Sequence, residues 1–217
     1  MKKLILIIAL LSATTVTYSQ KRFNLTFIAS PQMSWLRSDS KEIKASKSFL
    51  GFGYGVEGDI FLGSENYSIT TGITVSSTGG SLTYSPALQF NGKELPADTK
   101  IDYLVTYLEM PLAMKMRTRD FNRTRYYAQF GLTNWFNIRS RASSSDGIFQ
   151  KEAIKGEMRF CNIGLNLGVG LEYDLGSGNA LTYGLIYSNS FTDATNNTAI
   201  KESTTLRVVR FRLGFVF

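Results

Sequence analysis

The sequence predicts an all-β protein whose chain forms an eight-stranded antiparallel up-and-down transmembrane β-barrel. Three observations support this fold class. Apolar and polar residues alternate with a period of two along eight segments, the connections between these segments are alternately long and short, and the apolar face is too bulky for a barrel interior. With 217 residues, of which 43% are hydrophobic, the chain has the size and composition of one folded domain.

Four of the predicted strands lie in the first half of the chain. The first strand shows the pattern, with Phe23, Phe27 and Trp35 on one face and Asn24 and Ser30 on the other. Such strict alternation is typical of a strand that meets different surroundings on its two faces. The four predicted strands are 23–35, 49–62, 67–77 and 101–117.

The second half of the chain repeats this alternation. Its clearest segment sets Cys161, Leu165 and Val169 against Gly164 and Gly168, so that Cys161 is expected to face outward as a small apolar residue. The four predicted strands are 125–138, 158–174, 181–188 and 209–217.

The connections between the predicted strands provide a second, independent signal. Their lengths alternate from long to short along the whole chain, so that the short turns gather at one end and the long loops at the other. An outer-membrane barrel sorts its connections in this way, and strands of this length suit a tilted membrane span. The connections are 37–48, 63–66, 78–100, 118–124, 139–156, 175–179 and 192–204.

An eight-stranded barrel is only just wide enough for side chains to fill its interior. The many large side chains of the apolar face would not fit there, so this face must point outward to lipid. The opposite face is rich in Gly, Ser, Thr and Asn, which fit a narrow lumen. Charged residues on that face must pair with one another to offset their desolvation. The expected lumen charge network contains Glu57, Asp59, Glu109, Lys115, Arg125, Glu172, Arg210 and Arg212.

Glu109 has two interpretations. As a structural residue it forms a buried ion pair with Arg210 or Arg212 that fixes the register of a sealed barrel. As a functional residue it is a lumen carboxylate that transports or senses a ligand. The structural interpretation is the favoured one, and Pro111 beside it indicates a local irregularity in the strand.

Aromatic side chains on the outward face are expected to mark the two membrane–water interfaces. Tyr and Trp prefer this position because one part of the side chain is apolar and another part is polar. The predicted aromatic girdle contains Trp35, Tyr54, Tyr67, Tyr126, Tyr173 and Tyr187.

The first residues of the chain have the pattern of an export signal. Lys2 and Lys3 precede a short apolar run, and small and hydroxyl residues follow it up to Gln20. This run is too short to span a membrane permanently. We therefore expect residues 1–19 to be a cleaved signal peptide, with cleavage near Gln20, and residues 20–217 to be an outer-membrane β-barrel domain.

The composition excludes several kinds of chemistry. The chain has no His and one Cys, so it holds no Ser-His-Asp triad, no imidazole metal site and no intrachain disulfide. We expect no catalytic residues, no cofactor and no metal, and therefore a protein that is not an enzyme. Two alternatives stay open: a secreted soluble ligand-binding β-barrel, and an outer-membrane enzyme lacking a histidine base.

The long connections are the expected interaction surfaces. The connections 37–48 and 139–156 lean basic, which favours attraction to lipopolysaccharide phosphates. The connection 78–100 contains apolar residues that indicate either a partner-binding patch or a small folded flap. The expected partners are outer-membrane lipid and lipopolysaccharide, the barrel-assembly machinery and other outer-membrane proteins, with no nucleic acid. The candidate partner residues are Leu82, Tyr84, Leu88 and Phe90.

One segment resembles a known family. The sequence Tyr-Leu-Glu-Met-Pro-Leu-Ala-Met-Lys over 107–115 is similar to the Tyr-Leu-Glu-hydrophobic-Pro segment of the PorT-like outer-membrane β-barrel proteins, found in the phylum that uses type IX secretion. The segments 67–73, 126–131 and 210–217 support the resemblance. It implies an integral barrel in the outer membrane. It also implies an accessory part in protein secretion, with secretion proteins as partners, because a founding member of the family is tied to that process.

Overall fold

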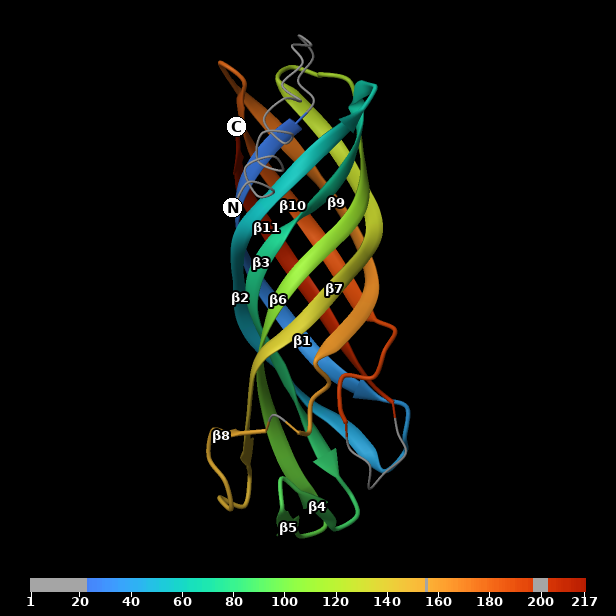
Figure 1. Ribbon diagram of the computed structural model, residues 1–217, viewed down its shortest axis with the longest axis vertical. Helices are drawn as coiled ribbons and strands as arrows, with labels where there is room; N and C mark the ends of the chain where they lie inside the picture. The colour runs from blue at the N-terminus through green and yellow to red at the C-terminus, as the bar shows by residue number, and fades with distance from the viewer. Residues whose placement is uncertain (1–22, 155, 197–202) are drawn as a thin grey trace, which may run out of the picture.

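The protein is described by a computed structural model that places residues 23–154, 156–196 and 203–217 (Figure 1). The described residues contain eight long strands and three short ones, β4, β5 and β8. No helix among them is long and apolar enough to cross a membrane. The strands are β1 (Phe23–Ser38), β2 (Ile43–Leu62), β3 (Ser64–Tyr84), β4 (Leu88–Phe90), β5 (Lys93–Leu95), β6 (Thr99–Arg117), β7 (Thr124–Ser144), β8 (Glu152–Ala153), β9 (Cys161–Gly176), β10 (Asn179–Ser190) and β11 (Thr204–Val216).

The eight long strands close into a barrel, which confirms the predicted fold class. Each pairs antiparallel with its neighbours along the chain, in the order β1-β2-β3-β6-β7-β9-β10-β11. The barrel closes where β1 meets β11, with Phe27 opposite Phe215 and Trp35 opposite Arg207. A closed sheet satisfies its backbone hydrogen bonds internally, as a structure that spans hydrocarbon must do.

Three tight turns lie together at the end that we call the short-turn end, at the top of Figure 1. Gly63 alone joins β2 to β3, and its φ of 71° lies in the left-handed region, which glycine adopts without steric cost. The connection between β6 and β7 turns at Asn122 and Arg123, with φ of 48° and 64°, which lie between the bridged residues Phe121 and Thr124. The β9–β10 turn is Ser177 and Gly178, again with positive φ. The predicted short connections are therefore confirmed.

At the opposite end, which we call the long-loop end, the strands run farther than the sequence predicts. The segments expected as loops 37–48 and 78–100 are largely strand, and the segment 139–156 is partly strand. The reason is that β2 begins at Ile43, β3 ends at Tyr84, β6 begins at Thr99 and β7 ends at Ser144. The remaining connection between β3 and β6 holds the hairpin β4–β5, and that between β7 and β9 holds β8. The predicted loop boundaries were wrong here because the strands continue after their outward residues have stopped being apolar.

The outer wall of the barrel is an apolar belt. Side chains such as Leu112 (55% exposed) and Phe211 (48% exposed) project outward from the strands, and no further layer of the described chain covers them. The belt has a sharp limit toward the long-loop end, where successive outward positions change from Trp35 to Arg37 and from Val75 to Ser77. The part of the barrel beyond this limit is the outer extension, formed by residues 43–48 of β2, 77–84 of β3, 99–103 of β6 and 139–144 of β7.

The interior has two zones. Toward the short-turn end the buried side chains are mostly polar and charged, as predicted. Inside the outer extension the inward side chains are mostly apolar, together with the buried Thr78, Ser140 and Ser144, and the outward side chains are mostly polar, which is closer to the pattern of a water-soluble barrel. The buried apolar core at this end contains Leu36, Ile43, Leu82, Tyr84, Leu88, Phe90, Leu95, Ile101, Tyr103, Val105, Tyr107, Trp135, Ala142, Phe149, Ile154, Met158, Ala194, Leu206 and Val208.

Candidate functional site

The charged side chains of the lumen begin near the short-turn end with a four-residue cluster. Lys115 Nζ lies 2.9 Å from Asp59 Oδ2 and 3.5 Å from Glu172 Oε1. Arg117 also bridges the two acids, with Nε donating to Glu172 Oε2 over 2.9 Å and Nη2 donating to Asp59. Thr70 donates a further hydrogen bond to Asp59. All four ionic side chains are almost completely buried, and each faces opposite charges.

Two further ion pairs lie on the lumen side of the C-terminal strand β11. Arg212 Nη2 lies 2.6 Å from Glu57 Oε2, and Arg212 Nη1 donates to Gln129 Oε1 over 3.1 Å. Arg210 forms a two-pronged contact with Glu109, with Nη1 donating over 2.5 Å and Nη2 over 3.1 Å. The predicted pairing of Glu109 with Arg210 or Arg212 is therefore resolved in favour of Arg210. This pair joins β6 to β11 directly across the lumen.

One predicted member of the network is replaced by another. Arg125 lies at the short-turn rim, where it pairs with the exposed Glu65 and Asp120 rather than with the buried cluster. Its hydrogen bond lowers the pKa of the Asp120 carboxyl. Its place in the buried cluster is taken by Arg117, which lies two residues after Lys115 and therefore on the same face of β6, but is absent from the predicted network. This spacing of two residues is the sequence signal that identifies Arg117 as a lumen residue.

In the part of the lumen toward the short-turn end, four acidic and four basic side chains of the described residues therefore pair with one another. Removing one partner from such a pair leaves an unsatisfied buried charge, whereas an intact pair holds two strands in one register. No group of His, Cys, Asp or Glu that could hold a metal ion occurs among the described residues.

The hairpin β4–β5 closes the long-loop end. Phe90 stacks on Phe149 with ring centroids 5.5 Å apart and meets Tyr103 edge-on at 6.0 Å. Beside this stack, Lys93 Nζ lies 2.8 Å from Glu152 Oε1. These contacts tie the hairpin to the β7–β9 connection and to β6.

The predicted exposed patch in this region is corrected by the structure. Leu82, Tyr84, Leu88 and Phe90 are all buried in the apolar core. Of the two interpretations of the 78–100 connection, the structure shows the folded flap. The reason is geometric, since β3 and β6 extend far enough to enclose these side chains within the barrel wall.

The predicted girdle residues lie on the outward face, as expected. Tyr67, Tyr126 and Tyr173 adjoin the short turns and are exposed. Tyr54, which is exposed, and Trp35 and Tyr187, which are half-buried, lie farther along their strands toward the long-loop end. Cys161 is exposed, as predicted.

The basic residues predicted near the long loops have different environments. Arg139 and Arg141 lie on the outward face of β7, and Lys44 lies on the outward face of β2. The acidic residue Glu152 in the same connection pairs with Lys93. Lys155 lies outside the described residues.

A closed barrel with an apolar outer belt and a charge-filled lumen defines an integral membrane β-barrel. Residues 17–196 match the family described as outer membrane protein beta-barrel domain, and the chain belongs to this family. The protein is therefore an outer-membrane β-barrel. No curated protein matches the sequence.

Several solved outer-membrane barrels have a similar fold. Neisserial surface protein A is 13% identical, with a TM-score of 0.52 over 89% of this chain and 95% of that chain. A major outer membrane protein from Thermus thermophilus is 11% identical, with a TM-score of 0.49 over 90% and 98% of the two chains. The outer membrane protease OmpT from Escherichia coli is 10% identical, with a TM-score of 0.43 over 94% and 99%. At 13% identity, the similarity to Neisserial surface protein A shows a shared fold and nothing more.

Proposed function

We propose that this protein is a non-enzymatic structural or interaction protein of the outer membrane that acts through its long-loop end. The observation that carries the proposal is the contrast between its interior and its exterior. The lumen is filled by ion pairs at one end and by an apolar core at the other, whereas the outer extension presents polar outward side chains such as Lys44, Thr83 and Arg141 beyond the belt. In an outer-membrane barrel the long loops face the outside of the cell.

The absence of histidine from the sequence supports a non-enzymatic role, because it removes the base on which most hydrolytic sites depend. The apolar outer belt argues against the secreted soluble barrel, whose exterior would have to be wetted. In this proposal residues 1–19 are the cleaved signal peptide, and the partners are lipopolysaccharide, the barrel-assembly machinery and other outer-membrane proteins.

An accessory role in protein secretion is the second candidate function. The observation that favours it is the PorT-like segment 107–115, whose Glu109 and Lys115 occupy central positions in the lumen charge network. In this candidate role the segment keeps the barrel rigid while the outer extension contacts a secretion component.

The first experiment combines cell fractionation with gel electrophoresis in detergent, with and without boiling. We expect an outer-membrane band that shifts on heating, since closed barrels resist unfolding in cold detergent. A photo-crosslinking residue at Thr83, on the outward face of the extension, should then capture a protein partner, while one at Leu112 in the belt should not. A heat-insensitive soluble protein, or equal capture from both positions, would refute the proposal.

A further inference from the structure

The outer wall has an irregularity where the belt meets the outer extension. The register between β6 and β7 shifts at this point, because Thr106 pairs with Arg139 while Tyr107 pairs with Asn137. Ile138 is the extra residue of this β-bulge. The bulge turns both Ile138 and Arg139 outward, although they are consecutive in the sequence. Bulges at barrel rims commonly redirect a side chain in this manner.

A recess of about 260 Å³ lies at the bulge. One of its walls comes from β7 and the other from the segment that leads into β9, where Met158 is buried and Phe160 is 70% exposed. The segment is held to β7 by a 2.7 Å hydrogen bond from the backbone N–H of Asn137 to the backbone carbonyl of Phe160. Phe136 in the belt lies beside Phe160, with ring centroids 6.0 Å apart. The recess therefore has an apolar border on its belt side.

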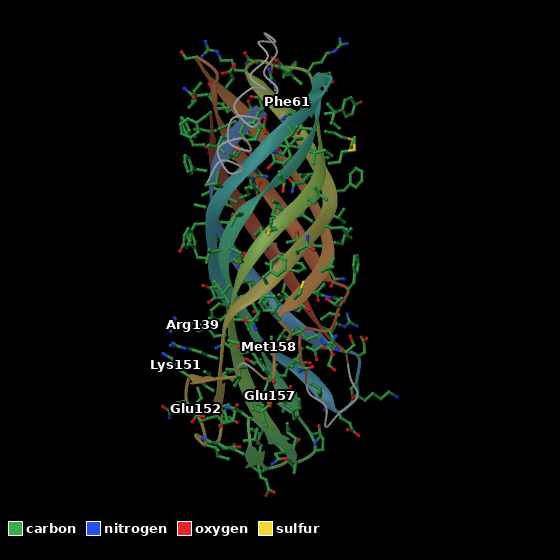
Figure 2. All side chains as sticks on the ribbon, in the orientation of Figure 1. Phe61, Arg139, Lys151, Glu152, Glu157 and Met158 are labelled. Carbon is green, nitrogen blue, oxygen red and sulfur yellow. The ribbon has the colours of Figure 1, made fainter. Side chains whose placement is uncertain are left out.

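The other border of the recess is basic. Arg139 lines it, Arg141 follows on the same outward face of β7, and the Lys151 amide donates to Ser143 Oγ over 2.9 Å, which places Lys151 beside this strand. Figure 2 shows the side chains of Arg139 and Lys151 projecting from the same flank of the barrel. None of the ion pairs formed by the described residues involves Arg139, Arg141 or Lys151.

We propose that this recess, formed by Ile138, Arg139, Met158 and Phe160 and bordered by Arg141 and Lys151, binds the phosphorylated headgroup of an outer-leaflet glycolipid. The level at which the recess lies in the membrane determines which kind of molecule can occupy it. It lies where the outward residues change from apolar to polar, which is the level of lipid headgroups, so acyl chains contact Phe136 and phosphates meet the guanidinium groups. Arginine suits this task because its planar fork donates to two phosphate oxygens at once.

The inference deepens the proposed function, because it rests on the membrane placement given there and assigns its lipid partner a site. It concerns binding alone, and it is independent of whether the outer extension captures a protein.

The test uses the full chain refolded in detergent and native mass spectrometry with added lipid A. The variant Arg139→Gln/Arg141→Gln should bind bisphosphorylated lipid A about tenfold more weakly than the unchanged protein, since charge-assisted hydrogen bonds are lost. The matched control is Lys41→Gln/Lys44→Gln, which removes the same charge from exposed positions at the same end of the barrel, but from the β1–β2 region. We expect it to bind lipid A as the unchanged protein does.

Two further probes identify what is recognised. The unchanged protein should bind dephosphorylated lipid A about tenfold more weakly than bisphosphorylated lipid A. The Arg139→Gln/Arg141→Gln variant and the unchanged protein should bind dephosphorylated lipid A equally. Inorganic phosphate should not compete with lipid A, because it lacks the apolar part that contacts Phe136 and Phe160. Equal lipid A binding by the variant, or full competition by inorganic phosphate, would overturn the proposed lipid site. Heat-dependent mobility of the same samples reports on the barrel itself and thus tests the proposed function separately.

Discussion

Buried charge decides much of the behaviour of this barrel at the scale of single residues. Arg210 and Glu109 are both almost inaccessible to solvent and are joined by two hydrogen bonds across the lumen. Ser76 donates a further hydrogen bond to Glu109. Pairs of this kind are costly to break from one side, while their joint replacement by apolar residues can be neutral.

Replacing Glu109 alone by Leu should therefore lower the free energy of unfolding by about 3–5 kcal/mol, since it leaves Arg210 buried without its partner. The double variant Glu109→Leu/Arg210→Leu should recover most of this loss. Urea unfolding of the refolded barrel, followed by tryptophan fluorescence, measures both changes. The rim variant Arg125→Gln is the control, and it should cost less than about 1 kcal/mol because its ion pairs are partly exposed. Equal destabilisation by the single and double variants would contradict the coupling of Glu109 to Arg210.

At the scale of strands and loops, the sequence predicts the membrane-spanning part better than the part beyond it. Strands such as β9 were predicted well, because lipid on one side and a narrow lumen on the other impose strict alternation. In the outer extension that contrast is lost, because the outward residues are mostly polar and the inward residues include Leu82 and Tyr84, so these two resemble exposed loop residues when the chain is considered alone. The ion pairs across the lumen depend on the register of strands distant in sequence. For this reason the sequence predicts that Arg117 faces the lumen, but it does not predict which acids Arg117 pairs with.

The hairpin β4–β5 gives a test at this scale, because Phe90 is its main anchor in the core. Phe90→Ala should cost about 3–5 kcal/mol locally, by analogy with other buried Phe-to-Ala changes. We expect the barrel to remain heat-modifiable while the hairpin and the connection around Phe149 become sensitive to protease. The control is Phe121→Ala at the short-turn end, where the side chain is 74% exposed and its removal should change little. Loss of the inserted barrel in Phe90→Ala would show that the hairpin is required for assembly.

The position of the hairpin determines which residues a loop deletion can remove without damaging the barrel wall. Removal of residues 78–100 would cut into β3 and β6, which contribute to the barrel wall. A deletion confined to residues 86–97 leaves both strands complete and is expected to preserve assembly.

For the whole molecule, the polarity of the two ends determines what the barrel can contact. Its short-turn end carries ion pairs at the rim and tight hairpins, whereas its long-loop end extends beyond the belt and carries the lipid recess and the capping hairpin. In outer-membrane barrels short turns lie in the periplasm and longer loops lie outside the cell. Both the proposed function and the proposed lipid site require this orientation, because lipopolysaccharide occupies the outer leaflet.

Cysteine labelling of intact cells tests the orientation directly. In a Cys161→Ala background, Lys41→Cys places a thiol in the exposed β1–β2 loop, and Ser177→Cys places one in the exposed β9–β10 turn. A maleimide that does not cross membranes should label Lys41→Cys in intact cells, and should label Ser177→Cys only after the outer membrane is permeabilised. Cys161→Ala alone is the control for background labelling. The reverse pattern would place the long-loop end in the periplasm and would remove the recess from the leaflet that supplies its phosphorylated glycolipid.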